Sequence, residues 1–240
     1  MFNAVYIASI IVTIIIIFFV IAVVIQQRKV SKWQQARIAA EINTLEAERK
    51  RIAGDLHDEL GPLLSAIKLQ INHLEPSNES ETIVLEKSST QIDGIIQRFR
   101  EISYDLLPNT LVRKGFIKAT EEFINKIKTL QTLHIIFIAD AFSLEAAKEI
   151  NLYRIVQEII QNTLKHARAT TLNIQVTKKE KSIFLQTKDD GVGFNYNEKS
   201  LEAKGVGLLS LQSRAQILGG QLIVITQPGA GTIFQLEIPL

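Results

Sequence analysis

The sequence predicts an α plus α/β protein with an apolar N-terminal helix, a helical hairpin and a C-terminal α/β domain. Three observations lead to this fold class. Residues 1–27 carry no charged side chain, residues 30–107 carry apolar side chains at spacings of three and four, and residues 110–240 alternate between helical and strand patterns. The 240 residues leave room for one large domain or two small ones beyond the apolar helix.

Residues 4–25 are predicted to form a transmembrane helix, because they are almost all Ile, Val, Phe and Ala. About 20 such residues are needed for a helix to cross a bilayer. The segment lacks the basic start and the Ala-x-Ala cleavage site of a secretory signal, and a buried core helix is the alternative interpretation. Arg28, Lys29 and Lys32 follow the segment, so the positive-inside rule places the larger part of the chain in the cytoplasm.

A long helix is predicted next, from Val30 to about Leu74 with a break near Pro62. Its narrow apolar stripe is typical of a helix that faces a partner helix, and residues 28–50 are expected to be a coiled-coil signalling linker. The stripe consists of Ile38, Ile42, Leu45, Ile52, Leu56, Leu60, Leu63, Ile67, Ile71 and Leu74.

A second helix, from about Thr82 to Leu107, completes a hairpin, because residues 75–80 have the composition of a turn. Two antiparallel helices cannot bury their apolar stripes alone. Residues 45–108 are therefore expected to form a four-helix bundle in a homodimer.

Residues 110–240 are predicted to form a separate α/β domain with a mixed or antiparallel sheet. Its expected helices lie near residues 115–130, 144–167 and 207–218. Its expected strands lie near residues 134–139, 171–177, 182–189, 221–226 and 231–238, with a flexible stretch at 195–204.

Composition excludes several classes of function. The net charge of +2 is spread along the chain, so no basic patch for nucleic acid is evident. The absence of cysteine excludes disulfides, thiolate metal sites and thiol catalysis. No group of His, Asp and Glu has zinc spacing, and His73 and His134 are interpreted as a solvated and a structural residue.

His57 is the first candidate for chemistry. Advancing about 100° per residue from Leu56 places His57 at the edge of the apolar stripe, with the bare Gly61 in the next turn. Asp58 could accept a hydrogen bond from Nδ1 of His57, which would leave Nε2 as a nucleophile. Pro62 costs a helix interior about 3 kcal/mol and indicates a hinge. A solvated histidine and an accidental proline are the alternative interpretations.

A second polar set lies on the predicted helix near residues 144–167. Glu158, Asn162 and His166 are spaced by four and should share one face, with Lys165 beside them. The amide oxygen of Asn162 suits Mg²⁺, and Lys165 or His166 could meet phosphate charge. An ordinary amphipathic helix often carries such a face, so this pattern alone decides little.

Three glycine turns follow this helix. The Asp189 carboxylate, at the end of a strand, can accept a hydrogen bond from an adenine amino group, and the hydroxyl of Thr232 is placed to support it. The start of a helix at the second turn favours phosphate. None of the turns is a phosphate loop or a dinucleotide fingerprint. The turns are Asp189-Asp190-Gly191-Val192-Gly193, Gly205-Val206-Gly207 and Gly229-Ala230-Gly231-Thr232.

Residues 51–68, Arg-Ile-Ala-Gly-Asp-Leu-His-Asp-Glu-Leu-Gly-Pro-Leu-Leu-Ser-Ala-Ile-Lys, resemble the histidine box of two-component sensor histidine kinases. They are most similar to the branch in which Asp follows the His, which includes nitrate-type sensors and membrane thermosensors. The resemblance implies that His57 is phosphorylated and that Asp58 is its helper acid or base. Gly61 and Pro62 stand where such kinases carry phosphatase residues, which puts a phosphatase activity in doubt.

The order of the Asn helix, the Asp-x-Gly-x-Gly turn, the Gly-x-Gly helix and the Gly-Thr strand resembles the ATPase fold of gyrase, Hsp90-type chaperones and histidine kinases. This resemblance implies an α/β sandwich over residues 110–240 that uses ATP and Mg²⁺. It assigns Mg²⁺ to Asn162 and adenine to Asp189. Gly191 and Gly193 would shape the pocket, and Gly205 and Gly207 would border the phosphates under a lid at 195–204.

Together these resemblances imply a single-pass sensor histidine kinase of the bacterial inner membrane, with its catalytic part in the cytoplasm. It would pass its phosphoryl group to an aspartate of a separate, DNA-binding response regulator without touching nucleic acid itself. Its signal would enter through the lipid bilayer or another membrane protein. The alternatives are a degenerate dimeric scaffold that docks a regulator and an ATPase of this fold that phosphorylates a protein serine. The presence of His57, Asn162 and Asp189 argues against the scaffold, and the apolar stripe around His57 argues against the serine kinase.

Overall fold

The computed structural model describes residues 2–128, 133–196 and 206–240. The chain divides into two compact units, residues 1–42 and residues 43–240. The first unit is helical, and the second contains a helical hairpin followed by an α/β domain.

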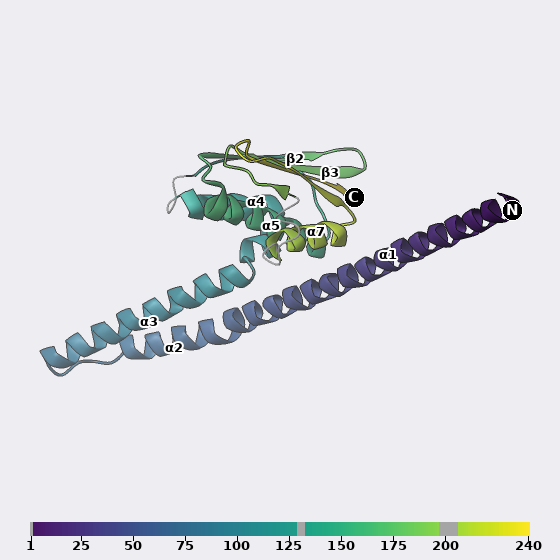
Figure 1. The fold of residues 1–240 in the computed structure, drawn as a ribbon. Coiled ribbons are helices and arrows are strands. Elements are labelled where there is room, and N and C mark those ends of the chain that lie inside the picture. Colours follow the sequence, from purple (N-terminus) through teal and green to yellow (C-terminus); the bar gives the residue numbers. More distant parts are fainter. Residues whose placement is uncertain (1, 129–132, 197–205) are drawn as a thin grey trace. The chain divides into compact units, whose positions relative to one another are not determined.

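Helix α1 (Phe2–Asp55) contains the apolar segment and the linker that follows it (Figure 1). Large apolar side chains between residues 11 and 25 are exposed, and Phe18 is the most exposed of them at 72%. The expected transmembrane helix is not found, because no helix in the described residues is both long and apolar enough to cross a membrane.

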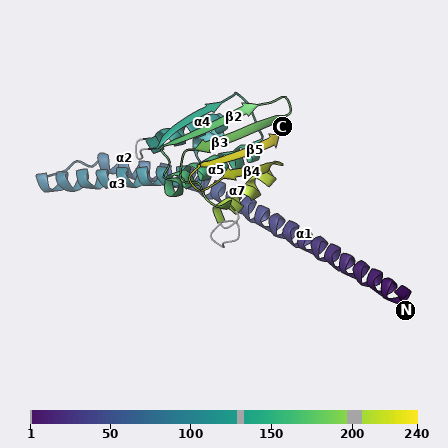
Figure 2. The same ribbon diagram turned by 45° about the horizontal axis from the view of Figure 1, so that its top comes forward.

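The hairpin is formed by α2 (Gly61–Asn72) and α3 (Glu79–Leu106), which lie side by side in Figures 1 and 2. A salt bridge of 2.6 Å joins Lys68 Nζ on α2 to Asp93 Oδ1 on α3. Helix α3 begins earlier than predicted, because the Asn78 side chain caps it by accepting a hydrogen bond of 2.9 Å from the backbone N–H of Glu81. Apolar side chains remain exposed on both helices, among them Leu63, Ile67, Ile83, Ile95 and Ile102.

Helix α4 (Asn109–Lys128) also begins before its predicted start. Gly115 divides it with φ 78° and ψ −177°, a conformation that glycine adopts without the strain of a side chain. The predicted helix corresponds to the second piece, in which Phe116 is 1% exposed.

Five strands form the sheet of the C-terminal domain: β1 (His134–Ala139), β2 (Thr171–Lys178), β3 (Ser182–Asp189), β4 (Gln221–Thr226) and β5 (Thr232–Pro239). Their order is β1-β2-β3-β5-β4. Strands β1 and β2 are parallel and the other neighbouring pairs are antiparallel, so the predicted mixed sheet is confirmed.

Helices α4, α5 (Ala146–Asn162) and α7 (Val206–Ile217) cover one face of this sheet (Figure 1). Tyr153 and Ile159 on α5, and Ile174 and Leu185 on the sheet, are each no more than 1% exposed. The apolar cluster between the layers provides most of the hydrophobic stabilisation of the domain. The predicted α/β sandwich is therefore confirmed.

A buried ionic cluster lies between α1, α5 and α7. Glu46 Oε1 accepts a hydrogen bond of 2.8 Å from Arg214 Nη2, and Glu46 Oε2 accepts one of 3.3 Å from Arg154 Nε. The three side chains are 9%, 7% and 6% exposed, respectively. Arg154 also donates to the main-chain oxygen of Leu106 at the end of α3. Buried charges need such partners, so this cluster depends on all three side chains.

Candidate active site

His57 lies in a π-helical segment, η1 (Leu56–Leu60), between α1 and α2. Single π-helical turns are rare and occur frequently at functional sites. The break predicted at Pro62 is instead a widened turn around the histidine, and Pro62 falls in the first turn of α2, where its missing N–H costs little. The angle of about 100° per residue assumed α-helical geometry and does not hold across this segment. Asp58 is exposed. Its hydrogen bond to His57 stays a prediction, because the structure does not describe the side chain of His57.

Glu158 and Asn162 lie on one face of α5, as their spacing predicts. Asn162 Nδ2 donates a hydrogen bond of 3.0 Å to Glu158 Oε1. A second π-helical segment, η2 (Thr163–Ala167), begins directly after Asn162. It changes the helical phase, so the exposed His166 does not follow the spacing of four that placed it on this face, and the exposed Lys165 lies in the same segment.

The oxygen atoms of Glu158 and Asn162 form the kind of donor set that Mg²⁺ prefers. Within the described part of the chain, no group of three or more His, Asp or Glu residues could hold a metal ion. A hard ion held by these two oxygen atoms would take its remaining ligands from water and phosphate.

The Asp189 carboxylate organises the first glycine turn. Its Oδ1 accepts hydrogen bonds from the backbone N–H groups of Gly191, at 2.9 Å, and Thr232, at 3.2 Å. Asp189 is 4% exposed, and this burial raises the pKa of its carboxyl, although the two N–H groups oppose the rise. The predicted support from Thr232 comes through its backbone, because its hydroxyl pairs instead with that of Thr226 at 3.2 Å.

Two glycines of this turn allow close approach of neighbouring backbone. A Cβ on Gly191 would lie 2.4 Å from the carbonyl oxygen of Ala167, and one on Gly193 would lie 2.0 Å from that of Gln227. Gly193 also has a positive φ of 58°. The turn is thus packed against the end of η2 on one side and the β4–β5 connection on the other, and no other residue fits at either position.

The Gly-x-Gly segment at the start of α7 meets the polar face of α5. A Cβ on Gly207 would lie 2.6 Å from Glu158 Oε1 and 3.6 Å from Asn162 Nδ2. The structure therefore brings Glu158, Asn162 and Gly207 together. Gly205 and residues 197–204 of the predicted lid lie outside the described residues.

Two residues that hold this region together, Asp190 and Thr226, were not predicted as site residues from the sequence. Asp190 binds the start of β2 through Thr170 and Thr171. The hydroxyl of Thr226 donates to the carbonyl oxygen of Gly231 at 3.0 Å and accepts from the backbone N–H of Phe194 at 3.1 Å. The place of Asp190 inside the Asp-Asp-Gly turn was a usable signal, whereas nothing in the sequence around Thr226 marks it.

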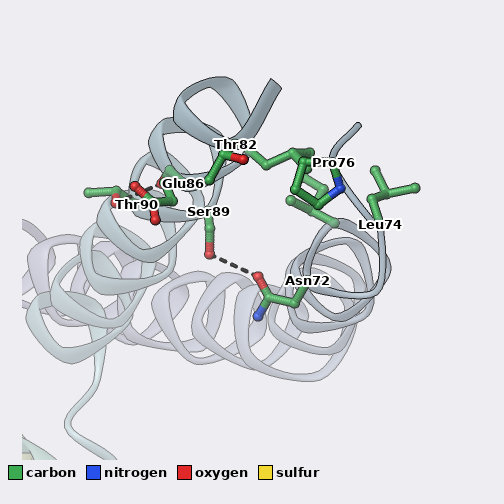
Figure 3. Close-up of a pocket in the computed structure, with 9 residues that line it drawn as sticks. Asn72, Leu74, Pro76, Thr82, Glu86, Ser89 and Thr90 are labelled. Atoms are coloured by element: carbon green, nitrogen blue, oxygen red, sulfur yellow. Dashed lines mark hydrogen bonds between the residues drawn. The ribbon is translucent and has the colours of Figure 1, made fainter. Parts of the chain in front are cut away.

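A separate hollow of about 470 Å³ lies between α2 and α3 near their connecting turn (Figure 3). Ser89 Oγ donates a hydrogen bond of 3.1 Å to Asn72 Oδ1 beside it. None of the predicted site residues lines this hollow, so we do not assign the chemistry to it.

Two family models match the chain in the order of these segments. Residues 48–111, which include His57, match the model described as "Histidine kinase". Residues 147–240, which include Asn162 and Asp189, match that of the histidine kinase-, DNA gyrase B- and HSP90-like ATPases. The chain belongs to the two-component sensor histidine kinases. The family predicted from the histidine box is confirmed.

Curated relatives of this histidine kinase have similar sequences over most of its length. It is 30% identical over 205 residues to the sensor histidine kinase ComP of Bacillus subtilis, which covers 81% of this chain and 27% of ComP. It is 27% identical over 220 residues to the oxygen sensor histidine kinase NreB of Staphylococcus carnosus, which covers 89% of this chain and 62% of NreB. The kinase thus spans less than two thirds of the length of either relative.

Solved histidine kinases also match. The histidine kinase domain of the blue-light activated histidine kinase from Erythrobacter litoralis EL346 aligns with a TM-score of 0.48 at 20% sequence identity. The alignment covers 76% of this kinase and 94% of that chain.

Proposed function

We propose that this kinase transfers the γ-phosphoryl group of ATP to His57 and then to an aspartate of a separate response regulator. The observation that supports this most directly is the approach of Gly207 to Glu158 and Asn162. It puts the N-terminus of a helix, which attracts phosphate, beside oxygen atoms suited to Mg²⁺.

The nucleotide would lie between this corner and the Asp189 turn. Asp189 keeps its Oδ2 for the adenine amino group, because both backbone N–H groups donate to Oδ1. Asn162 and Glu158 would hold Mg²⁺, which supplies neutralisation of the phosphate charge. Lys165 and His166 are exposed and follow Asn162 closely in the sequence, and we propose that one of them meets the phosphate charge.

The chemical step we propose is an in-line displacement. The lone pair of His57 Nε2 forms a bond to the γ-phosphorus, the bond to the β–γ bridging oxygen breaks, and ADP leaves with that electron pair. The Nδ1 proton of the resulting imidazolium is then shared with or taken by Asp58. The same N–P bond breaks when a regulator aspartate attacks, which restores the histidine.

We propose a homodimer in which α2 and α3 pair with those of a second copy. The exposed apolar side chains Leu63, Ile67 and Ile95 support this, because a single hairpin leaves them in water.

We also propose that residues 4–25 anchor the chain to the bacterial inner membrane, with the catalytic part in the cytoplasm. The exposed run that includes Ile14 to Phe19 supports that proposal.

Labelling of the full chain in liposomes with γ-³²P-ATP tests the function. Acid-labile, alkali-stable label is expected on the wild type and should be absent from His57→Gln and Asn162→Ala. Sedimentation of the same liposomes, washed at alkaline pH, tests the anchor.

The main rival is a dimeric scaffold that docks a regulator without phosphorylating itself. A wild-type chain that binds ADP, remains dimeric and takes no label in liposomes would favour this scaffold and contradict our proposal. Label on serine that survives acid would favour the serine kinase instead.

A further inference from the structure

Asp190 joins the Asp189 turn to the chain that leaves the Asn162 helix. Its Oδ1 accepts hydrogen bonds from the backbone N–H groups of Thr170, at 2.8 Å, and Thr171, at 2.9 Å. Its Oδ2 accepts one of 2.5 Å from the Thr170 hydroxyl. These donors lower the pKa of the Asp190 carboxyl, the Thr170 hydroxyl most of all, as expected for hydrogen bonds to the charged form.

Backbone hydrogen bonds complete the connection. The N–H of Val192 donates to the carbonyl oxygen of Ala167 at 2.8 Å, and that of Asp190 donates to the carbonyl oxygen of Thr171 at 3.3 Å. Arg168, between these acceptors, has a positive φ of 49°, which is costly for a residue with a side chain. These hydrogen bonds therefore hold residues 167–171 in a backbone conformation that the positive φ of Arg168 makes unfavourable without them.

This connection lies between the two halves of the nucleotide site. Residues 163–167 form η2, which follows Asn162 directly, and Asp190 lies between Asp189 and Gly191. Through Asp190, Asn162, which is assigned to Mg²⁺, and Asp189, which is assigned to adenine, are held at a fixed distance from each other. A nucleotide must contact both ends at once, so an error in that separation reduces binding.

We propose that Asp190 is a positioning residue of the ATP site, which sets the adenine turn against the Mg²⁺ end without contacting the nucleotide. This inference rests on the proposed roles of Asp189 and Asn162. It assigns to Asp190 an effect on nucleotide affinity that goes beyond its effect on folding.

A matched control exists at the other end of the same strand. Asp140 is also exposed, and its Oδ2 accepts a hydrogen bond of 2.9 Å from the backbone N–H of Lys178 at the end of β2. Asp140→Ala removes the same group from the same strand, but away from the nucleotide turn. Asp190→Asn keeps an acceptor for both backbone N–H groups and an amide that can donate to the Thr170 hydroxyl.

The experiment measures KM for ATP in autophosphorylation of the full chain, together with ADP affinity and thermal unfolding. We expect Asp190→Ala to raise KM and the ADP Kd by about tenfold, or about 1.4 kcal/mol. At saturating ATP its rate should remain within about threefold of wild type, since the reacting groups are intact. Asp190→Asn should restore KM to near the wild-type value, and Asp140→Ala should leave KM unchanged.

The proposal is overturned if Asp190→Ala and Asp140→Ala change KM alike, or if Asp190→Asn is as impaired as Asp190→Ala. If Asp190→Ala does not fold, Thr170→Val removes one hydrogen bond of the connection and should still raise the ADP Kd, with Thr170→Ser as its rescue. An unchanged Kd in Thr170→Val then overturns the proposal. Asp189→Asn distinguishes a failure of the Asp190 inference from a failure of the proposed function. If this change leaves ADP affinity unchanged, the assignment of adenine to Asp189 is itself wrong.

Discussion

At the scale of a single residue, Asp189 illustrates how burial of a carboxyl opposes its charged form. Burial raises the pKa of its carboxyl. Such a group stabilises the fold at low pH, and that contribution is lost as the pH rises from about 4 through the folded-state pKa. The charged form of this carboxyl would therefore be held more favourably with a further hydrogen-bond donor beside it.

Asp189→Asn should separate stability from binding. The Asn oxygen can still accept from the N–H groups of Gly191 and Thr232, so the unfolding temperature at pH 7 should equal or exceed that of wild type. Its amide N–H groups would face the adenine amino group, and ADP affinity should fall at least about tenfold. Thermal scans across pH and calorimetric titration with ADP measure both.

The pH dependence provides the check on this explanation. The stability advantage of Asp189→Asn should be small below about pH 4 and should grow as the pH rises through the folded-state pKa of the wild-type carboxyl. An advantage that shrinks with rising pH would contradict the burial argument.

At the scale of the element, the two π-helical segments η1 and η2 mark the positions where chemistry is assigned. One contains His57 and the other follows Asn162. Each interrupts the regular phase of a helix, so side chains before and after it face different directions. In η1 this leaves the turn after His57 wide, and Gly61 begins the next helix without a side chain.

Gly61→Ala tests whether that bare turn serves the histidine. A Cβ on Gly61 would meet nothing within 4 Å, so the change should raise the free energy of unfolding by about 0.5–1 kcal/mol, as Ala does for Gly in a helix. We expect the labelling rate of His57 to fall severalfold, because the spacing of four predicts that an added methyl group would cover the histidine from the next turn.

Gly94→Ala in α3 is the control for this change. It is equally open, with nothing within 4 Å of an added Cβ, and should give the same gain in urea denaturation without slowing the label. Equal labelling by the two variants would show that Gly61 has no role beyond its helix.

The regular elements could be predicted from the sequence and the irregular ones could not. Strands β1, β3 and β4 have their predicted bounds, because apolar alternation and flanking turn residues define a strand locally. A spacing of three and four cannot reveal a single widened turn, so η1 and η2 were read as α-helix. Asp189 could be found from its motif. The partners of Asp190 lie at least 19 residues away and those of Thr226 at least 5, and only the fold brings them together.

At the scale of the whole molecule, Glu46 connects the helix that leads to His57 with the ATP-binding domain. Its carboxylate is shared by Arg154 on α5 and Arg214 on α7. Glu46→Ala would leave two buried guanidinium groups without that partner, and breaking a buried ion pair costs roughly 3–5 kcal/mol. Urea denaturation of the full chain should show a loss of this order.

Glu48→Ala is the matched change on the same helix. Glu48 pairs with Arg51 at 2.5 Å, but both side chains are at least half exposed. Solvent-exposed pairs contribute little, so its denaturation curve should nearly coincide with that of wild type. Similar losses in the two variants would mean that the cluster around Glu46 is not the stabilising contact we infer.

The position of β4 at one edge of the described sheet has a consequence for handling the protein. Ile223 and Ile225 on this strand are each 51% exposed. An edge strand that presents apolar side chains beside main-chain groups able to pair can add to the same strand of another molecule. Concentrated preparations are therefore open to slow aggregation through β4, and Ile223→Lys would place a gatekeeper charge there.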